Sequence, residues 1–317
     1  MKSDDFTFVK GEDFTFKSDE GTEIFVYKWL PMAKKEIIGV VQIAHGMAEN
    51  AGRYEALAKK LTNEGFAVYA NDHRGHGKTA ESVEKQGILA DSEGFKWMVE
   101  DVHKLTGIIK ENHADMPVFL LGHSMGSFIA QKYIMLYGNE LNGVILSGTN
   151  GKQGLMLSVG SLVAMLECQL KGRDSKSLRL TQMSFGSYNN NFKPVRTIFD
   201  WLSRDTNEVD KYINDPYCGT VFTNGFFYDF LEGLKEIEKQ KNMAKVPKDL
   251  PIYMFSGAKD PVGNEGKGVR DLYDSYKSLG IKDVKIKLYD GGRHEMLNET
   301  NKEEVMEDLM EWINAHV

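Results

Sequence analysis

Short apolar runs alternate along this chain with longer segments in which apolar residues return every three or four positions. Five of the runs predict buried strands: residues 37–44, 67–70, 118–121, 144–146 and 252–255. Segments of helical period follow four of them: residues 53–64, 95–113, 125–137 and 269–279. This alternation predicts an α/β fold, in which helices cover both faces of a mostly parallel sheet.

Both ends of the chain extend the pattern. Residues 14–17 and 24–29 predict an N-terminal hairpin, and residues 284–288 alternate apolar and charged positions as on a half-exposed strand. A final helix is expected after Thr300, which together with Glu303 matches the pattern of a capping box.

Residues 149–225 interrupt the alternation, because no strand–turn–helix unit can be traced in them. We therefore expect an α/β core made of residues 1–148 and 226–317, with a mainly helical cap inserted at 149–225. With 317 residues and 41% hydrophobic content, the chain can bury a large core. The cap falls between two core strands, at the edge where open α/β sheets bind ligands.

The strand at 118–121 ends in Gly122-His123-Ser124-Met125-Gly126, and helical spacing begins at once. This is the Gly-x-Ser-x-Gly pattern of a nucleophile elbow, a turn so tight that the serine hydroxyl is pushed out of it. Glycines two residues before and after the serine remove side chains that would collide. The following helix directs the positive end of its dipole at this point. Ser124 is therefore the candidate nucleophile.

A serine hydroxyl needs a base to take its proton, and in this architecture the acid and then the base follow the serine along the chain. Asp260 comes after the strand at 252–255, and His294 comes after the strand at 284–288. Asp290 competes for the role of acid, but it shares the loop of His294 and suits a turn. Asp260 and His294 are therefore the candidate acid and base.

An oxyanion formed at Ser124 needs backbone N–H donors. One is expected from Met125, directly after the nucleophile, and the other from the loop that follows the strand at 37–44. That loop begins His45-Gly46-Met47, which makes the amide of Met47 the second candidate donor. His45 itself is expected to hydrogen-bond to the loop backbone rather than to transfer protons.

In these segments the chain resembles the α/β-hydrolase family of monoacylglycerol lipases and bacterial lysophospholipases, a serine aminopeptidase S33-like hydrolase domain. The matching motifs are HGMAENAGRY at 45–54, DHRGHG at 72–77, GHSMG at 122–126, WLSRD at 201–205, DP at 215–216 and 260–261, and HEMLNE at 294–299. The resemblance covers residues 12–317. It implies an α/β-hydrolase fold and hydrolysis of single-chain lipid esters through Ser124, Asp260 and His294. The family often has a small residue where Met47 stands, so this side chain is expected to narrow the pocket.

Within the cap, residues 155–166 are apolar almost all round. One interpretation is a helix packed on the core beside a solvated loop. The other is a lid in which Leu155, Leu162 and Met165 line an acyl tunnel and make transient contact with lipid aggregates or a membrane surface. In that case phosphate head groups would meet the basic stretch that follows: Lys171, Arg173, Lys176 and Arg179.

Composition limits the partners. The net charge of −7 argues against nucleic acid, and the two cysteines form neither a metal-binding motif nor a disulfide framework. We expect no metal and no cofactor. Residues 1–11 are charged and polar, unlike a signal peptide, and no apolar run approaches the ~18 residues of a membrane span. These features predict a cytoplasmic enzyme with a small-molecule ester as substrate.

Three alternative functions stay open from the sequence. A proline-iminopeptidase-like peptidase would use the same three side chains but needs an acidic site for a free amine. A small-ester esterase or thioesterase would lack the preference for lipid. A non-catalytic binding protein on a hydrolase scaffold is disfavoured by the complete set of Ser124, Asp260 and His294.

Overall fold

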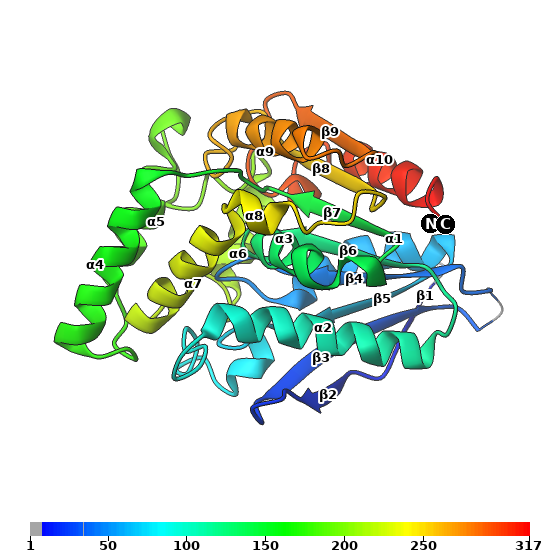
Figure 1. Ribbon diagram of the computed structural model, residues 1–317, viewed down its shortest axis with the longest axis horizontal. Helices are drawn as coiled ribbons and strands as arrows, with labels where there is room; N and C mark the ends of the chain where they lie inside the picture. The colour runs from blue at the N-terminus through cyan, green and yellow to red at the C-terminus, as the bar shows by residue number, and fades with distance from the viewer. Residues whose placement is uncertain (1–7, 34) are drawn as a thin grey trace.

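The computed structural model describes residues 8–33 and 35–317, and in this part of the chain nine strands form one sheet (Figure 1). Their order is β1-β3-β5-β4-β6-β7-β8-β9, and β2 pairs with β3. The strands are β1 (Phe8–Lys10), β2 (Phe14–Lys17), β3 (Glu23–Pro31), β4 (Gly39–Ala44), β5 (Phe66–Asn71), β6 (Val118–His123), β7 (Gly143–Ser147), β8 (Ile252–Gly257) and β9 (Val284–Tyr289). Pairing is parallel from β5 to β9 and antiparallel where β1, β2 and β5 meet β3. The predicted α/β fold is confirmed.

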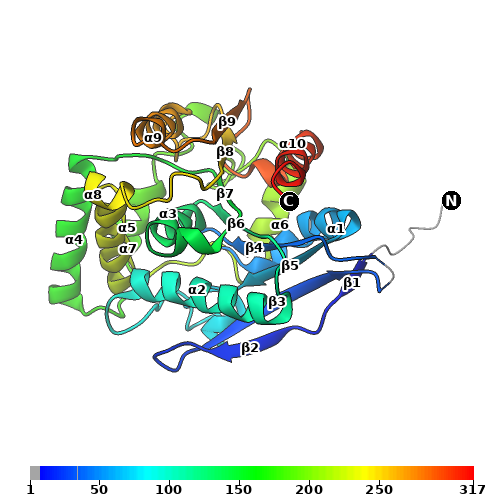
Figure 2. The same ribbon diagram turned by 45° about the vertical axis from the view of Figure 1, so that its right-hand side comes forward.

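Helices cover the sheet in two layers, which Figure 2 separates. Leu57, Ala58 and Leu61 of α1 share one buried cluster with α10, whereas α2, α3 and α9 contribute to the other. The helices are α1 (Glu55–Glu64), α2 (Gly94–Asn112), α3 (Met125–Tyr137), α4 (Leu155–Lys171), α5 (Leu178–Phe185), α6 (Thr206–Asn214), α7 (Asn224–Ile237), α8 (Gln240–Met243), α9 (Lys267–Ser278) and α10 (Lys302–Asn314).

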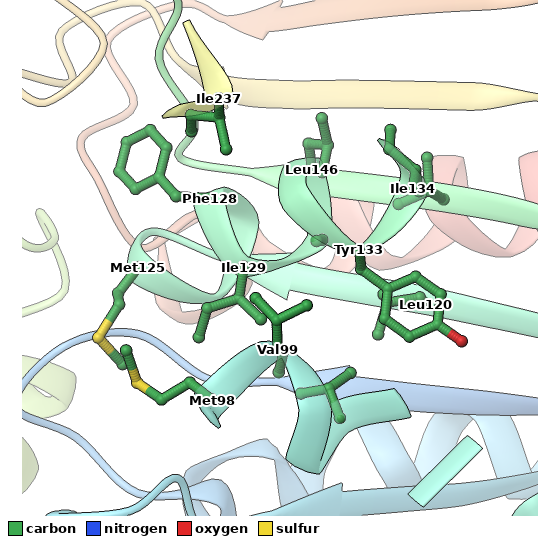
Figure 3. Packing of buried hydrophobic residues seen from close by; sticks show 14 of the residues in the cluster. Met98, Val99, Leu120, Met125, Phe128, Ile129, Tyr133, Ile134, Leu146 and Ile237 are labelled. Carbon is green, nitrogen blue, oxygen red and sulfur yellow. The ribbon is translucent and has the colours of Figure 1, made fainter. Parts of the chain in front are cut away.

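The central strands are buried on both faces, and their side chains alternate between the two layers. In β6, Leu120 packs with α2 and α3, whereas Phe119 and Leu121 belong to the cluster of α1 and α10. Figure 3 shows Leu120 among Ile129 and Tyr133 of α3. Strand β6 is therefore clamped from both sides, which holds the loop at its C-terminal end in place.

The N-terminal hairpin is confirmed, because β2 pairs with β3 antiparallel from Phe14↔Val26 to Lys17↔Glu23. The predicted capping box is wrong. Asn301, not Thr300, stands at the N-cap of α10, and the hydroxyl of Thr300 donates to Glu299 Oε2 at 3.3 Å. Glu299 is fully buried and also accepts the backbone N–H of Thr300, which turns Thr300 away from the helix.

Between β7 and β8 the chain forms helices α4 to α8, which continue to Met243, beyond residue 225 where the helical segment was expected to end. α4 and α7 lie side by side at one end of the molecule, with α5 beside them (Figures 1 and 2). α7 also packs against α2 and α3 and contributes Phe226, Phe227 and Phe230 to the main core. The helical segment is thus anchored to the core chiefly through α7. Within the described residues, no helix has the length and apolar character needed to span a membrane.

Candidate active site

Ser124 stands in strained backbone geometry between β6 and α3. Its φ is +50° and its ψ is −116°, a region that costs a non-glycine residue about 1–3 kcal/mol. The flanking glycines permit the turn, because a Cβ on Gly122 would lie 2.3 Å from Gly126 O and one on Gly126 would lie 2.0 Å from Ala44 O. The clamped strand β6 sustains this strain, and the serine remains partly exposed. This is the geometry that the Gly-x-Ser-x-Gly pattern predicts.

Asp260 and His294 form a buried pair at the ends of β8 and β9. Nδ1 of His294 lies 3.0 Å from both carboxylate oxygens of Asp260, and the two side chains are 2% and 0% exposed. Asp260 also accepts hydrogen bonds from Ser256 Oγ at 2.7 Å and from the N–H of Val262 at 2.9 Å. These donors hold the carboxylate in one orientation toward the imidazole.

The pair shifts both pKa values in the direction that favours charge separation. Burial alone would lower the pKa of His294, but the charge and hydrogen bond of Asp260 outweigh burial and raise it. Burial alone would raise the pKa of Asp260, but His294 and the other donors lower it. With Nδ1 committed to the carboxylate, Nε2 is the nitrogen that can exchange a proton with a neighbouring group.

The loop after β4 carries Met47 beside Ser124. A Cβ on Gly46 would lie 3.3 Å from Cβ of Ser124, so the two loops are in close contact. His45 is fully buried, its Nδ1 lies 2.7 Å from Gly46 O, and its Nε2 accepts the N–H of His73 at 2.9 Å. Burial lowers the pKa of His45 to about 4, so the ring is neutral and braces the loop, as expected from the sequence.

A buried charge cluster that sequence reasoning missed supports this loop. Glu49 accepts the N–H of Gly46 at 2.6 Å and pairs with Arg53 at 2.6 Å. Arg53 also binds Glu295, the neighbour of His294, through two hydrogen bonds of 2.7 Å. Arg53 therefore ties the loop of Met47 to the loop of His294. Glu49, Arg53 and Glu295 all lie within the family motifs at 45–54 and 294–299, but nothing in those motifs indicated that Arg53 would pair with both carboxylates.

The helical segment between β7 and β8 is hydrogen-bonded to the same two loops. The N–H of Glu295 donates to Leu202 O at 2.7 Å, and the ring of Trp201 lies 5.1 Å from that of His294. On the other side, Tyr212 Oη donates to Ala48 O at 2.8 Å. Residues 201–212 are thus part of the framework that places the loops.

Ser124 borders two cavities. The larger, of about 680 Å³, is also bordered by Met47 and His294, and the smaller, of about 240 Å³, by Met47 and Met125. Ser124 and Met47 border both cavities, His294 borders the larger one and Met125 borders the smaller one, so all four residues lie around the same pair of cavities. Asp260 lies behind His294.

The three apolar cap residues singled out in the sequence lie elsewhere. Leu155 and Leu162 on α4 are 85% and 53% exposed, and neither they nor Met165 border the two cavities that contain Ser124. α4 instead contributes Met156, Leu157 and Gly160 to the smaller cavity. The helix is apolar on nearly every side, so its sequence did not indicate which side would face inward.

The serine aminopeptidase S33 family model matches residues 35–301. The chain belongs to the serine aminopeptidase S33 family. A relative from Mycolicibacterium smegmatis, named monoacylglycerol lipase, is 32% identical over 311 residues, which cover 96% of this chain and 98% of that protein.

Solved structures share the fold of this chain. A thermostable carboxyl esterase from Bacillus coagulans, crystallised with glycerol, superposes with a TM-score of 0.89 at 32% identity, over 96% of this chain and 98% of that one. A monoglyceride lipase from Saccharomyces cerevisiae, bound to a substrate analogue, shares the fold with a TM-score of 0.77 at 20% identity, over 99% and 98% of the two chains. This S33 family member is an ester hydrolase.

Proposed function

We propose that the protein hydrolyses esters of single-chain lipids, monoacylglycerols or lysophospholipids, through an acyl-enzyme formed on Ser124. The observation that carries the proposal is that His294, paired with the buried Asp260, borders the same cavity as the strained, partly exposed Ser124. A strained serine and an imidazole of raised pKa that border one cavity supply the nucleophile and the base that nucleophilic catalysis requires.

The reaction runs in two steps. Nε2 of His294 removes the proton of Ser124 as its hydroxyl attacks the ester carbonyl, and Asp260 stabilises the imidazolium that forms. The amides of Met47 and Met125 hold the negative oxygen, and the positive end of α3 adds to this stabilisation. His294 then protonates the leaving alcohol. Water repeats the sequence on the acyl-enzyme and releases the acid.

The substrate class is supported by the relatives and by the character of the cavities. Named relatives that align over nearly the whole chain are monoacylglycerol lipases, and a lysophospholipase aligns over 38% of it. Three of the four basic residues singled out in the cap are engaged elsewhere, because Lys171 and Arg179 pair with Glu167 and Arg173 pairs with Asp229. Lys193, on the wall of the larger cavity, is the better placed cation for a phosphate head group.

We further propose that α4 contacts lipid aggregates or a membrane surface transiently. Its outer side carries large apolar residues that are exposed to solvent: Leu155, Val159, Leu162, Leu166 and Leu170. A row of exposed apolar side chains on a helix beside an active-site cavity is suited to contact with the interface at which lipid substrates reside.

Two further points stay predictions. One is the division into a core of residues 1–148 and 226–317 and a cap of residues 149–225, and the other is a cytoplasmic location.

A peptidase function is less well supported. The carboxylates that border the larger cavity within the described residues are Glu49 and Glu295, and both pair with Arg53. A free amino terminus would therefore compete with a bidentate guanidinium for them. A small-ester esterase function differs from the proposal in the length of acyl group that the cavities accept, whereas a thioesterase function differs in the leaving group, which is a thiol in place of an alcohol.

The decisive experiment combines active-site labelling with substrate profiling. A fluorophosphonate probe should modify Ser124, and Ser124→Ala should lower kcat by about 10³-fold or more on every ester. Ser187→Ala, an exposed serine of the cap, should keep the wild-type rate. Wild-type kcat/KM should rise from p-nitrophenyl acetate to longer acyl esters, and monoacylglycerol should then be compared with lysophosphatidylcholine. Absence of labelling, or equal rates for acetate and long-chain esters, would contradict the proposal.

A further inference from the structure

The imidazole of His294 is covered by groups from three other parts of the chain. The indole of Trp201 lies with its centroid 5.1 Å from that of the imidazole, at an angle of 37° between the planes. The ring of His123 lies 4.8 Å away. A Cβ on Gly148 would come within 2.9 Å of Cε1 of His294, so the backbone after β7 lies against the same ring. With these groups around it, the imidazole is only 2% exposed.

Trp201 is held in place by its own aromatic neighbours. Its side chain is 7% exposed, stacks on Phe185 at a centroid distance of 6.0 Å and meets Tyr188 edge-on at 4.8 Å. Its carbonyl oxygen accepts the backbone N–H of His294 at 3.4 Å. The indole is therefore fixed beside the imidazole by ring packing and by a backbone hydrogen bond.

Further hydrogen bonds join residues 200–204 to the loop at 293–299. Arg293 Nη1 donates to Ser203 O at 3.2 Å, and Ser203 Oγ donates to Asn298 O at 2.8 Å. The carboxylate of Glu299 accepts the N–H and the Nε of Arg204 at 3.0 and 2.9 Å. The indole and the imidazole thus stand on two segments that are bonded to each other along their length.

The ionisable groups around this imidazole come from four loops of the core: Asp260, Glu295, Glu49 and His123. Burial lowers the pKa of His123 to about 4, so that ring is neutral. Glu49 and Glu295 both pair with Arg53, which offsets part of their charge. Among the groups in contact with the imidazole, the Asp260 carboxylate and the face of the Trp201 ring are the ones that favour a positive charge on it.

An aromatic ring attracts a cation that lies within about 6 Å of its centroid, and tryptophan does so most strongly. The imidazole becomes such a cation when it accepts the proton of Ser124, and it stays one until the leaving group takes the proton. We propose that Trp201 is a positioning residue for the base, whose indole stabilises the imidazolium of His294 and holds it against Asp260. This inference rests on the proposed function, because it requires His294 to be the base. The helical segment then contributes to proton transfer as well as to the cavity walls.

Two substitutions separate the aromatic face from the bulk of the side chain. Trp201→Phe keeps an aromatic face, whereas Trp201→Leu keeps an apolar cover without one. In Trp201→Leu the acidic limb of the kcat/KM profile on p-nitrophenyl acetate should move to lower pH by about 0.5–1 unit, and kcat should fall about three- to tenfold. Trp201→Phe should retain most of the rate and most of the wild-type pH profile. Phe199→Leu removes a ring from the same segment and the same cavity wall and should leave the limb in place.

A second experiment changes the electron density of the indole and almost nothing of its shape. The four tryptophans of the chain are replaced biosynthetically by a monofluorinated and then by a trifluorinated analogue. Fluorine withdraws electrons from the ring face and weakens its attraction for a cation, so the acidic limb should move stepwise to lower pH. In a Trp201→Phe background the same fluorination should have no effect. This comparison decides the matter should Trp201→Leu fail to fold.

An acidic limb that stays in place in either experiment would overturn the inference. So would a shift to higher pH, which is expected if the indole only keeps water away from the imidazole, because hydration favours its charged form. An NMR titration of the imidazole, assigned through His294→Gln, measures the same shift without turnover. Wild-type protein that hydrolyses no ester through Ser124 would contradict the proposed function instead, which is a separate result.

Discussion

Nδ1 of His294 lies 3.0 Å from each carboxylate oxygen of Asp260, with both side chains withdrawn from solvent. Such a pair resists separation, because removing either partner leaves the other buried without its counter-charge. It fixes the ring so that Nε2 is available to the cavity of Ser124. Residues 34 positions apart in the chain thereby form one proton-accepting unit.

The pair predicts how the rate depends on pH. A base must be neutral to accept the proton of Ser124, so kcat/KM should fall as pH falls through the pKa of His294. Because Asp260 raises that pKa, this acidic limb should lie above the ordinary histidine value of about 6.5. In Asp260→Asn the limb should move to lower pH, and kcat should drop by about 10⁴-fold.

Asp290→Asn is the matched control for this variant. Asp290 is exposed on the same loop as His294 and should leave both the rate and the pH profile unchanged. A large loss of rate in Asp290→Asn, with wild-type behaviour of Asp260→Asn, would show that Asp290 and not Asp260 is the acid.

Arg53 should contribute strongly to stability. In Arg53→Ala, the carboxylates of Glu49 and Glu295 stay buried without their common partner, so the free energy of unfolding should fall by about 3–5 kcal/mol. Urea denaturation measures this directly. Arg196→Ala, which breaks an exposed pair with Asp210, should cost less than about 1 kcal/mol. Equal losses of stability in Arg53→Ala and Arg196→Ala would contradict the role of Arg53 in joining the loops of Met47 and His294.

The lid hypothesis can be tested on α4. Leu162→Glu combined with Met165→Glu should reduce hydrolysis of long-chain monoesters presented as aggregates far more than hydrolysis of soluble acetate esters, because the charges oppose contact with a lipid surface. Leu136→Glu places a charge on a comparably exposed leucine outside the cap and should affect neither substrate. Equal losses on both substrates in the double variant would speak against the lid.

Gly126→Ala should abolish the fold of the elbow. Its Cβ would lie 2.0 Å from Ala44 O and 2.7 Å from His45 O, and neither backbone carbonyl can move without displacing β4. Expression should yield little folded protein by circular dichroism. Gly107→Ala, on α2 with nothing within 4 Å of the added Cβ, should fold normally and gain about 0.5–1 kcal/mol. A folded and active Gly126→Ala would refute this account of the turn.

Much of the fold could be predicted because its signals are local. The apolar run before Gly122 and the helical period after Met125 identified β6, α3 and the turn between them, since strand and helix periods can be read within one segment. The same holds for the N-terminal hairpin. The capping-box prediction was wrong because the local pattern at Thr300 competes with a neighbouring buried group. The backbone N–H and the hydroxyl of Thr300 both donate to the buried carboxylate of Glu299.

The sequence places Ser124, Asp260 and His294 directly after three different strands. Because parallel strands bring the loops at their carboxyl ends to one edge of the sheet, this placement alone predicts that the three residues meet there. Only the tertiary structure decided what surrounds them. It brought Arg53 between Glu49 and Glu295, placed Leu157 and Gly160 rather than Leu155 and Leu162 on the wall of a cavity at Ser124, and placed Met47 on the walls of both cavities. These relationships join residues far apart in the chain. They depend on which face of each element is buried, and an almost wholly apolar helix such as α4 does not encode that choice in its own sequence.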